Sequence, residues 1–145
     1  MSKPTIIGKP AILVADDNPE WIENLEFSLG DQYRIVVATD LAAAANLAQE
    51  HGPEVMLLDW QIAQREVERA RAGITMDGGR PLPVILMTGF ERPVVDNVAH
   101  LIGGCIAVVE RLDTLEELER EIARVISCAQ RNVAREPRKK YASQR

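Results

Sequence analysis

Five short apolar runs alternate with stretches of helical character along this chain, and this alternation limits the possible folds more than any other feature. Several of the runs are apolar at consecutive positions, which is typical of parallel strands that are covered on both faces. The segments between the runs place apolar residues at helical spacing. We therefore expect an α/β fold with a single doubly wound, five-stranded parallel sheet of the (βα)5 type. The expected strands are residues 11–15, 34–38, 55–58, 84–87 and 106–109.

The helices between these strands carry local signals of their own. Asn18 is a suitable N-cap, and Pro19 occupies the first helical position, where the missing N–H has no cost. Gly30 follows as a stop signal. Further helices are expected at about 41–49, 61–72 and 93–102. A last helix is expected from a stripe of apolar residues at helical spacing: Leu115, Leu118, Ile122, Val125, Ile126 and Ala129.

The size and composition favour one cytoplasmic domain. The chain has 145 residues, of which 46% are apolar, and this is enough for a core of its own. No apolar run approaches the roughly 18 residues of a membrane span, and the N-terminus lacks the apolar segment of a signal peptide. Cys105 and Cys128 are isolated and show no CxxC spacing, so we expect two reduced, mostly buried thiols.

Polar side chains follow several of the expected strands at the point where each strand ends. Asp16 and Asp17 follow the first strand, Asp59 follows the third, and Thr88 follows the fourth. A single aspartate in such a place is most often an ordinary loop residue. However, the carboxyl ends of parallel strands meet at one edge of the sheet, where open α/β folds bind their ligands. Carboxylates that meet there repel one another, and a hard cation such as Mg²⁺, which prefers oxygen ligands, would neutralise them.

The segments that end at these residues resemble the core motifs of a known family. They read ILVADDNP, VMLLDW and VILMTG, and they resemble those of the receiver domain of two-component response regulators, over about residues 10–131. The resemblance implies a flavodoxin-like sheet with the strand order 2-1-3-4-5. It also implies that Asp59 accepts a phosphoryl group from a histidine kinase or a phosphotransfer protein in bacterial two-component signalling.

The resemblance also assigns roles to the residues at the strand ends. Asp59 would be the nucleophile, because a carboxylate can form an acyl phosphate with a suitable donor. Asp17, Asp59 and the backbone carbonyl of Gln61 would bind Mg²⁺, and Asp16 would act mainly through a metal-bound water. The hydroxyl of Thr88 would donate a hydrogen bond to a phosphoryl oxygen. We expect no enzymatic activity beyond self-catalysed phosphoryl transfer and autodephosphorylation.

The sequence departs from the family pattern at two places. The family has a lysine at the end of strand five, where this chain reads CIAVVERLD, so Glu110 or, with the register moved by one, Arg111 takes its place. Ala107 takes the place of an aromatic residue. A carboxylate at the lysine position would repel the phosphoryl group that an ammonium attracts. Behind Asp59 the early proline is missing and MDGG is displaced to residues 76–79, which predicts a helix close behind Asp59 and then a glycine-rich loop.

Two segments lie outside the resemblance. Residues 1–9 are expected to form an N-terminal extension, residues 10–131 the receiver domain, and residues 132–145 a basic tail. The tail carries five basic side chains against one acidic side chain, Glu136, although the whole chain has a net charge of −5. Because the tail lacks a folded reading element, we expect a solvated terminus and neither a nucleic-acid nor a membrane partner.

The expected protein is a single-domain response regulator that is phosphorylated at Asp59 and signals by contact with a downstream protein. The alternative is a pseudo-receiver, an adaptor that binds its partners independently of phosphorylation. A haloacid-dehalogenase-like phosphatase would need DxDxT after the first strand, whereas this chain reads DDNPE. The adjacent Val125 and Ile126 widen the apolar face of the last helix, which also predicts a homodimer through that helix.

Overall fold

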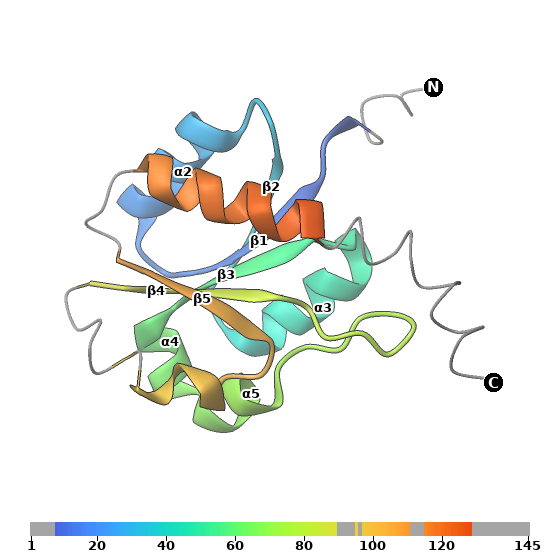
Figure 1. Cartoon of the computed structure of the whole chain (residues 1–145), viewed down its shortest axis with the longest axis vertical. Coiled ribbons are helices and arrows are strands. Elements are labelled where there is room, and N and C mark those ends of the chain that lie inside the picture. Colours follow the sequence, from blue (N-terminus) through green and yellow to red (C-terminus); the bar gives the residue numbers. More distant parts are fainter. Residues whose placement is uncertain (1–7, 90–94, 96, 111–114, 129–145) are drawn as a thin grey trace.

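A parallel sheet forms the centre of the computed structural model, which describes residues 8–89, 95, 97–110 and 115–128. The sheet has five strands in the order β2-β1-β3-β4-β5, and every strand pair is parallel (Figure 1). This confirms the predicted fold class and strand order. Each strand matches an expected run to within one residue at either end: β1 Ala11–Ala15, β2 Arg34–Ala38, β3 Val55–Asp59, β4 Val84–Thr88 and β5 Cys105–Glu110.

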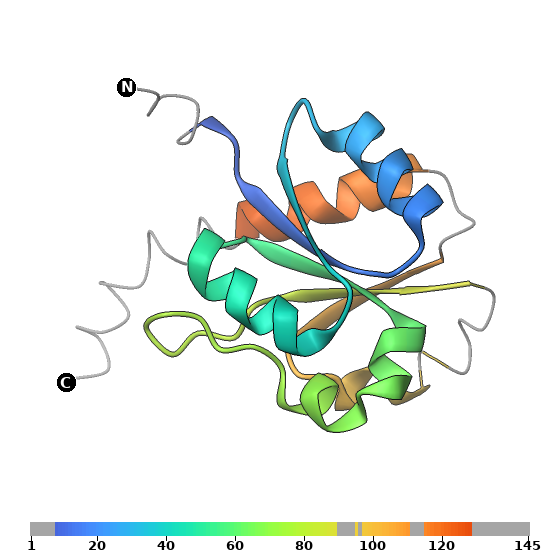
Figure 2. The same cartoon turned by 180° about the vertical axis from the view of Figure 1, so that it is seen from behind.

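Helices cover both faces of this sheet (Figures 1 and 2). One face packs against α2 (Pro19–Leu29) and the helical residues 115–128. The other face packs against α3 (Leu41–His51), α4 (Trp60–Arg65), α5 (Val67–Ala72) and the 3-10 helix η1 (Ala99–Leu101). Successive strand residues point to opposite faces, so that the neighbours Leu57 and Leu58 enter two different core clusters. Burial on both faces is the reason that the strands are apolar at consecutive positions.

The connection from β1 to α2 is built by local hydrogen bonds. Asn18 Oδ1 accepts hydrogen bonds from the backbone N–H groups of Glu20, at 3.0 Å, and of Trp21, at 3.2 Å, and Pro19 opens the helix. This confirms the predicted N-cap. The carboxylate of Asp16 in turn accepts a hydrogen bond from the backbone N–H of Asn18 at 2.9 Å. These bonds hold Asp16 and its neighbour Asp17 at the carboxyl end of β1.

The segment that was predicted as one helix over about 61–72 consists of two short helices. α4 begins directly behind Asp59, as predicted, but the helix is interrupted at Glu66, whose φ of −119° and ψ of 58° are not helical. The Glu66 carboxylate accepts a hydrogen bond from the backbone N–H of Leu41, at 3.1 Å, in the first turn of α3. The N–H groups of a first turn have no partner within their own helix. This contact with a distant part of the chain accounts for the interruption, and the prediction of one continuous helix was wrong.

The last two expected helices are described in part. Of the segment expected at about 93–102, residues 95, 97 and 98 are helical and η1 follows them. In the last helix the side chains of Leu118, Ile122, Val125 and Ile126 are buried against the sheet, and Ala129 lies outside the described residues. None of the described helices has both the length and the apolar character that crossing a membrane requires.

The displaced MDGG segment forms a tight turn between α5 and β4. Gly78 and Gly79 have φ values of 88° and 83°, in the left-handed region that favours glycine. The backbone N–H of Met76 donates to the carbonyl of Arg80 at 2.7 Å and closes the turn. Because the turn precedes β4, it lies at the amino edge of the sheet, opposite to the aspartates.

Candidate functional site

The carboxyl edge of the sheet, on the left in Figure 1, brings together residues that are far apart in the sequence. Asp16 directly follows β1, and Asp59 and Thr88 are the last residues of β3 and β4. β1 and β4 both pair with β3, so these three strand ends are neighbours. The predicted convergence of Asp16, Asp17, Asp59 and Thr88 at one edge is therefore present in the fold.

Three carboxylates form a compact cluster at this edge. Asp16, Asp17 and Asp59 each offer one carboxylate oxygen, and these oxygens all lie within 4.8 Å of one another. Asp16 is 0% exposed and Asp59 is 5% exposed, whereas Asp17 faces solvent. Burying neighbouring anions is costly unless a positive charge compensates them. A set of hard oxygen donors that is open to solvent on one side fits Mg²⁺, which keeps several of its waters.

Thr88 adds a hydroxyl to the edge beside Asp59. Its side chain is only 1% exposed, and its Oγ1 has no hydrogen-bond partner among the described residues. A buried polar atom without a partner costs about 1–3 kcal/mol. The Thr88 hydroxyl is therefore available as a donor to a ligand oxygen at the strand ends.

Glu110 is the last residue of β5 and lies directly opposite Thr88 in the parallel register. Its side chain is half-buried. This places a carboxylate at the end of β5, on the strand that neighbours the one with the buried hydroxyl. Arg111, the alternative at this position, lies outside the described residues. Ala107 packs against the core on the face covered by α2.

Gln61 occupies the first turn of α4, directly behind Asp59. In an α-helix the carbonyl groups point towards the C-terminal end, because each accepts a hydrogen bond from a later residue. The carbonyl of Gln61 in such a turn is directed away from the strand end that the helix leaves. The role of the Gln61 carbonyl as a metal ligand therefore stays a prediction.

Arg65 is a charged residue near the site that the sequence reasoning missed. It is the last residue of α4, and its Nη1 lies 3.6 Å from Oδ2 of Asp17. α4 belongs to the segment that was expected to be helical at about 61–72, and nothing in the periodicity of that segment indicates that α4 ends beside the first strand. One feature of the sequence did indicate a position near the site. A helix that begins immediately behind Asp59 has its first turns close to the strand ends.

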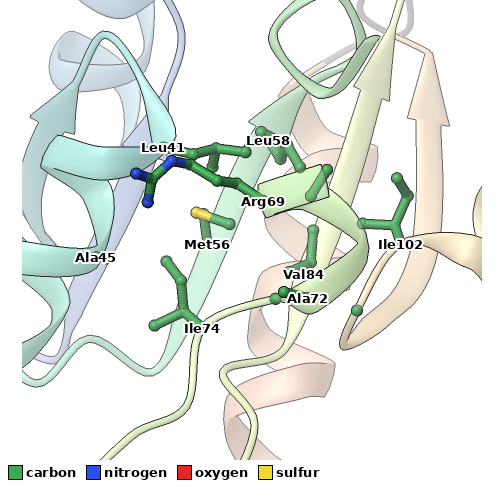
Figure 3. Close-up of a pocket in the computed structure, with 12 residues that line it drawn as sticks. Leu41, Ala45, Met56, Leu58, Arg69, Ala72, Ile74, Val84 and Ile102 are labelled. Carbon is green, nitrogen blue, oxygen red and sulfur yellow. The ribbon is translucent and has the colours of Figure 1, made fainter. Parts of the chain in front are cut away.

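The small cavity beneath α5 is a different kind of site. It has a volume of about 110 Å³ and is lined mainly by apolar side chains, among them Leu41, Met56, Leu58 and Val84 (Figure 3). Arg69 is the only charged residue among those that line it. The cavity lies within the core on the face covered by α3 and α5, and it contributes no chemistry to the strand ends.

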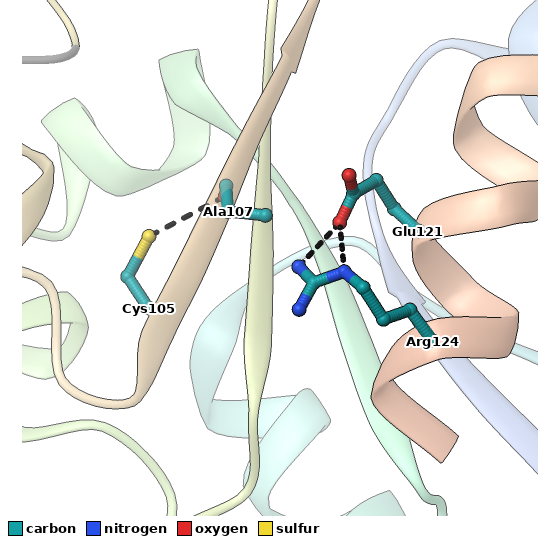
Figure 4. A network of polar contacts seen from close by, with 4 residues as sticks. All are labelled: Cys105, Ala107, Glu121 and Arg124. Atoms are coloured by element: carbon teal, nitrogen blue, oxygen red, sulfur yellow. Dashed lines mark hydrogen bonds and ion pairs between the residues drawn. The ribbon is translucent and has the colours of Figure 1, made fainter. Parts of the chain in front are cut away.

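The two cysteines also lie outside this cluster. Both are free and half-buried. Cys105 is the first residue of β5, at the end of the strand opposite to Glu110, and its Sγ donates to the carbonyl of Ala107 at 3.6 Å (Figure 4). Burial raises the pKa of the Cys105 thiol, which keeps it protonated near neutral pH. Figure 4 also shows the ion pair of Arg124 with Glu121 on the last helix, at 2.6 Å, which is a surface contact.

Comparison with known proteins identifies the fold. No protein-family model and no curated protein matches the sequence. Many solved structures match the fold, however, and several of them are receiver domains. A signal receiver domain from Vibrio parahaemolyticus has a TM-score of 0.66 at 15% identity, over 87% of this chain and 96% of that chain. The receiver domain of a DNA-binding response regulator from Colwellia psychrerythraea has a TM-score of 0.63 at 20% identity, over 82% of this chain and 99% of that chain.

A third match comes from a complex. It is a co-crystal structure of a Saccharomyces cerevisiae histidine phosphotransfer protein with the receiver domain of its downstream response regulator. Its TM-score is 0.63 at 16% identity, over 85% of this chain and 92% of that chain. The chain therefore has the fold of the response-regulator receiver domains, as the motifs at its strand ends predicted.

Proposed function

We propose that this protein is a receiver domain that accepts a phosphoryl group on Asp59 from a histidine kinase or a histidine phosphotransfer protein. One observation carries the proposal: three carboxylates converge within 4.8 Å at the carboxyl edge of a receiver-type sheet. Asp59 is the central member, because its strand lies between the strands that carry Asp16 and Thr88. The phosphorylated domain then signals in the cytoplasm by binding to a downstream protein.

The residues at the edge have separate roles in phosphoryl transfer. A carboxylate oxygen of Asp59 attacks phosphorus, and an oxygen–phosphorus bond forms while the bond from phosphorus to the histidine nitrogen of the donor breaks. The electron pair of the broken bond stays on that nitrogen. Such transfers depend on positioning and on neutralised charge more than on acid–base help. The Thr88 hydroxyl would donate a hydrogen bond to an oxygen of the transferred group.

Mg²⁺ fits the proposed site, and Asp17 and Asp59 would hold it, with Asp16 acting through a bound water. When bound, the ion supplies the positive charge that an anionic nucleophile needs in order to approach an anionic phosphoryl group. The protein itself holds the carboxylates in position. The backbone N–H of Asn18 holds the Asp16 carboxylate at 2.9 Å, and β3 holds Asp59 against the strand ends on either side.

Incubation with acetyl phosphate and Mg²⁺ tests the proposal. Intact-mass spectrometry should show the addition of one phosphoryl group to the wild-type chain, and removal of Mg²⁺ with EDTA should prevent it. A histidine phosphotransfer protein loaded with phosphate serves as a second donor. An unchanged mass with both donors would refute phosphoryl acceptance.

The second candidate function, a phosphorylation-independent adaptor, is favoured by one specific observation. Glu110 ends β5 directly opposite Thr88, so that a carboxylate lies on the strand beside the hydroxyl that would donate a hydrogen bond to the phosphoryl group. The two functions differ in their dependence on phosphate. An adaptor would bind its partner equally well with and without a phosphoryl mimic.

Glu110→Lys is expected to strengthen the binding of beryllofluoride, which mimics a phosphoryl group on Asp59, by about three- to tenfold. The substitution replaces a repelling carboxylate with an attracting ammonium at the end of β5, and tenfold corresponds to roughly 1.4 kcal/mol. The affinity is measured by calorimetry in the presence of Mg²⁺. Glu116→Lys on the last helix makes the same change of charge on an exposed residue and is the matched control. Equal affinities of the two variants would mean that Glu110 does not act on the site.

The predicted homodimer is a separate proposal. The apolar stripe of the last helix is buried against the sheet, so the described part of that stripe supplies no exposed face for pairing. Self-association through this helix stays a prediction, and it would have to use residues beside the stripe.

A further inference from the structure

An arginine already lies beside the aspartate cluster in the folded chain. Nη1 of Arg65 is 3.6 Å from Oδ2 of Asp17, and the two side chains are 54% and 49% exposed. Asp17 is the solvent-facing member of the cluster, through which an ion would enter. The guanidinium therefore contacts the cluster on its open side.

The fold fixes this contact at both ends of α4. The helix starts at Trp60, directly behind Asp59 of β3, and it ends at Arg65. Glu66 then leaves the helical conformation and binds the backbone N–H of Leu41 in the first turn of α3. Both ends of α4 are thus tied to other elements, and the backbone of Arg65 is held beside the carboxyl end of β1. The pairing with Asp17 follows from this placement.

We infer that Arg65 is an internal counter-ion of this site and competes with a divalent cation for Asp17. The guanidinium neutralises part of the negative charge of the cluster when no metal is bound. A metal that uses the Asp17 carboxylate has to displace the guanidinium or accept its repulsion. This inference rests on the proposed function for the nature of the ion, and it adds a residue that regulates the affinity of the site.

Removing the charge of Arg65 should therefore tighten metal binding. We expect Arg65→Gln to lower the dissociation constant for Mg²⁺ by about three- to fivefold, which is within the range of a half-exposed ion pair. Arg65→Lys keeps the charge and should stay close to the wild-type value. The difference between Arg65→Gln and wild type should shrink as the salt concentration rises, because salt screens an exposed pair.

Isothermal titration calorimetry of the full chain with Mg²⁺ measures these affinities. The matched control is Arg69→Gln, which removes the same charge from α5, where Arg69 lines the apolar cavity (Figure 3). The Arg69→Gln variant should differ from wild type by less than about twofold, since its charge is not in contact with Asp17. Circular dichroism confirms that each variant is folded.

Two results would overturn the inference. One is a Mg²⁺ affinity of Arg65→Gln that equals that of Arg69→Gln or is weaker than wild type. The other is a failure of both the wild type and Arg65→Gln to bind Mg²⁺. Neither result decides the proposed function, which depends on whether Asp59 gains a phosphoryl mass.

Discussion

Replacement of Asp59 by asparagine is expected to abolish phosphoryl uptake, while the wild-type chain gains one phosphoryl mass from acetyl phosphate and Mg²⁺. The amide has nearly the shape of the carboxylate but lacks its nucleophilic anion, so no acyl phosphate can form. Intact-mass spectrometry of both proteins under the same conditions measures the effect.

The control for this experiment is Asp77→Asn, in the glycine-rich turn at the opposite edge of the sheet, which should gain the phosphoryl group as the wild type does. Uptake of a phosphoryl group by Asp59→Asn would show that another residue is the acceptor.

The second large effect is expected at Gly103, in the turn that leads into β5. A Cβ atom at this position would lie 2.7 Å from the carbonyl oxygen of Arg71 and 2.8 Å from the backbone nitrogen of Gly73. The backbone N–H of Gly103 also donates to the carbonyl of Ala70 at 2.9 Å. Gly103→Ala therefore has to push the end of α5 away from this turn. We expect a loss of about 2–3 kcal/mol in the free energy of unfolding, as for other overpacked sites.

Urea denaturation monitored by circular dichroism measures this loss. Gly89→Ala is the matched control, because a Cβ atom there meets no atom of the described residues within 4 Å and the residue has no left-handed φ. That variant should change the free energy of unfolding by less than about 0.5 kcal/mol. Similar stabilities of the two variants would show that the turn before β5 yields without strain.

The sequence by itself determined the architecture of this protein. Strands that are buried on both faces are apolar at nearly every position, so their limits can be read to within a residue, as for β1 and β3. The cap at Asn18 is equally local, since its partners are two and three residues away. The convergence of Asp16, Asp59 and Thr88 followed as well, because parallel strands bring all their carboxyl ends to one edge.

What only the tertiary structure decided depends on contacts between distant segments. The interruption at Glu66 arises from its hydrogen bond to Leu41, which is 25 residues away. The periodic pattern within a single helix does not indicate such a contact. The position of Glu110 opposite Thr88 is set by the pairing of β5 with β4, which includes an irregularity between Val84 and Ile85 that no local signal marks.

The contact of Arg65 with Asp17 has the same origin. It requires α4 to start directly at the end of β3 and to stop where Glu66 binds α3, and both conditions must hold before the guanidinium reaches the first strand. Residue type and position identified the carboxylates that could hold a cation, because all three lie at the carboxyl ends of strands. The place of the Arg65 guanidinium beside Asp17 was decided by packing, because it depends on three elements, β3, α4 and α3, whose contacts form only in the folded protein.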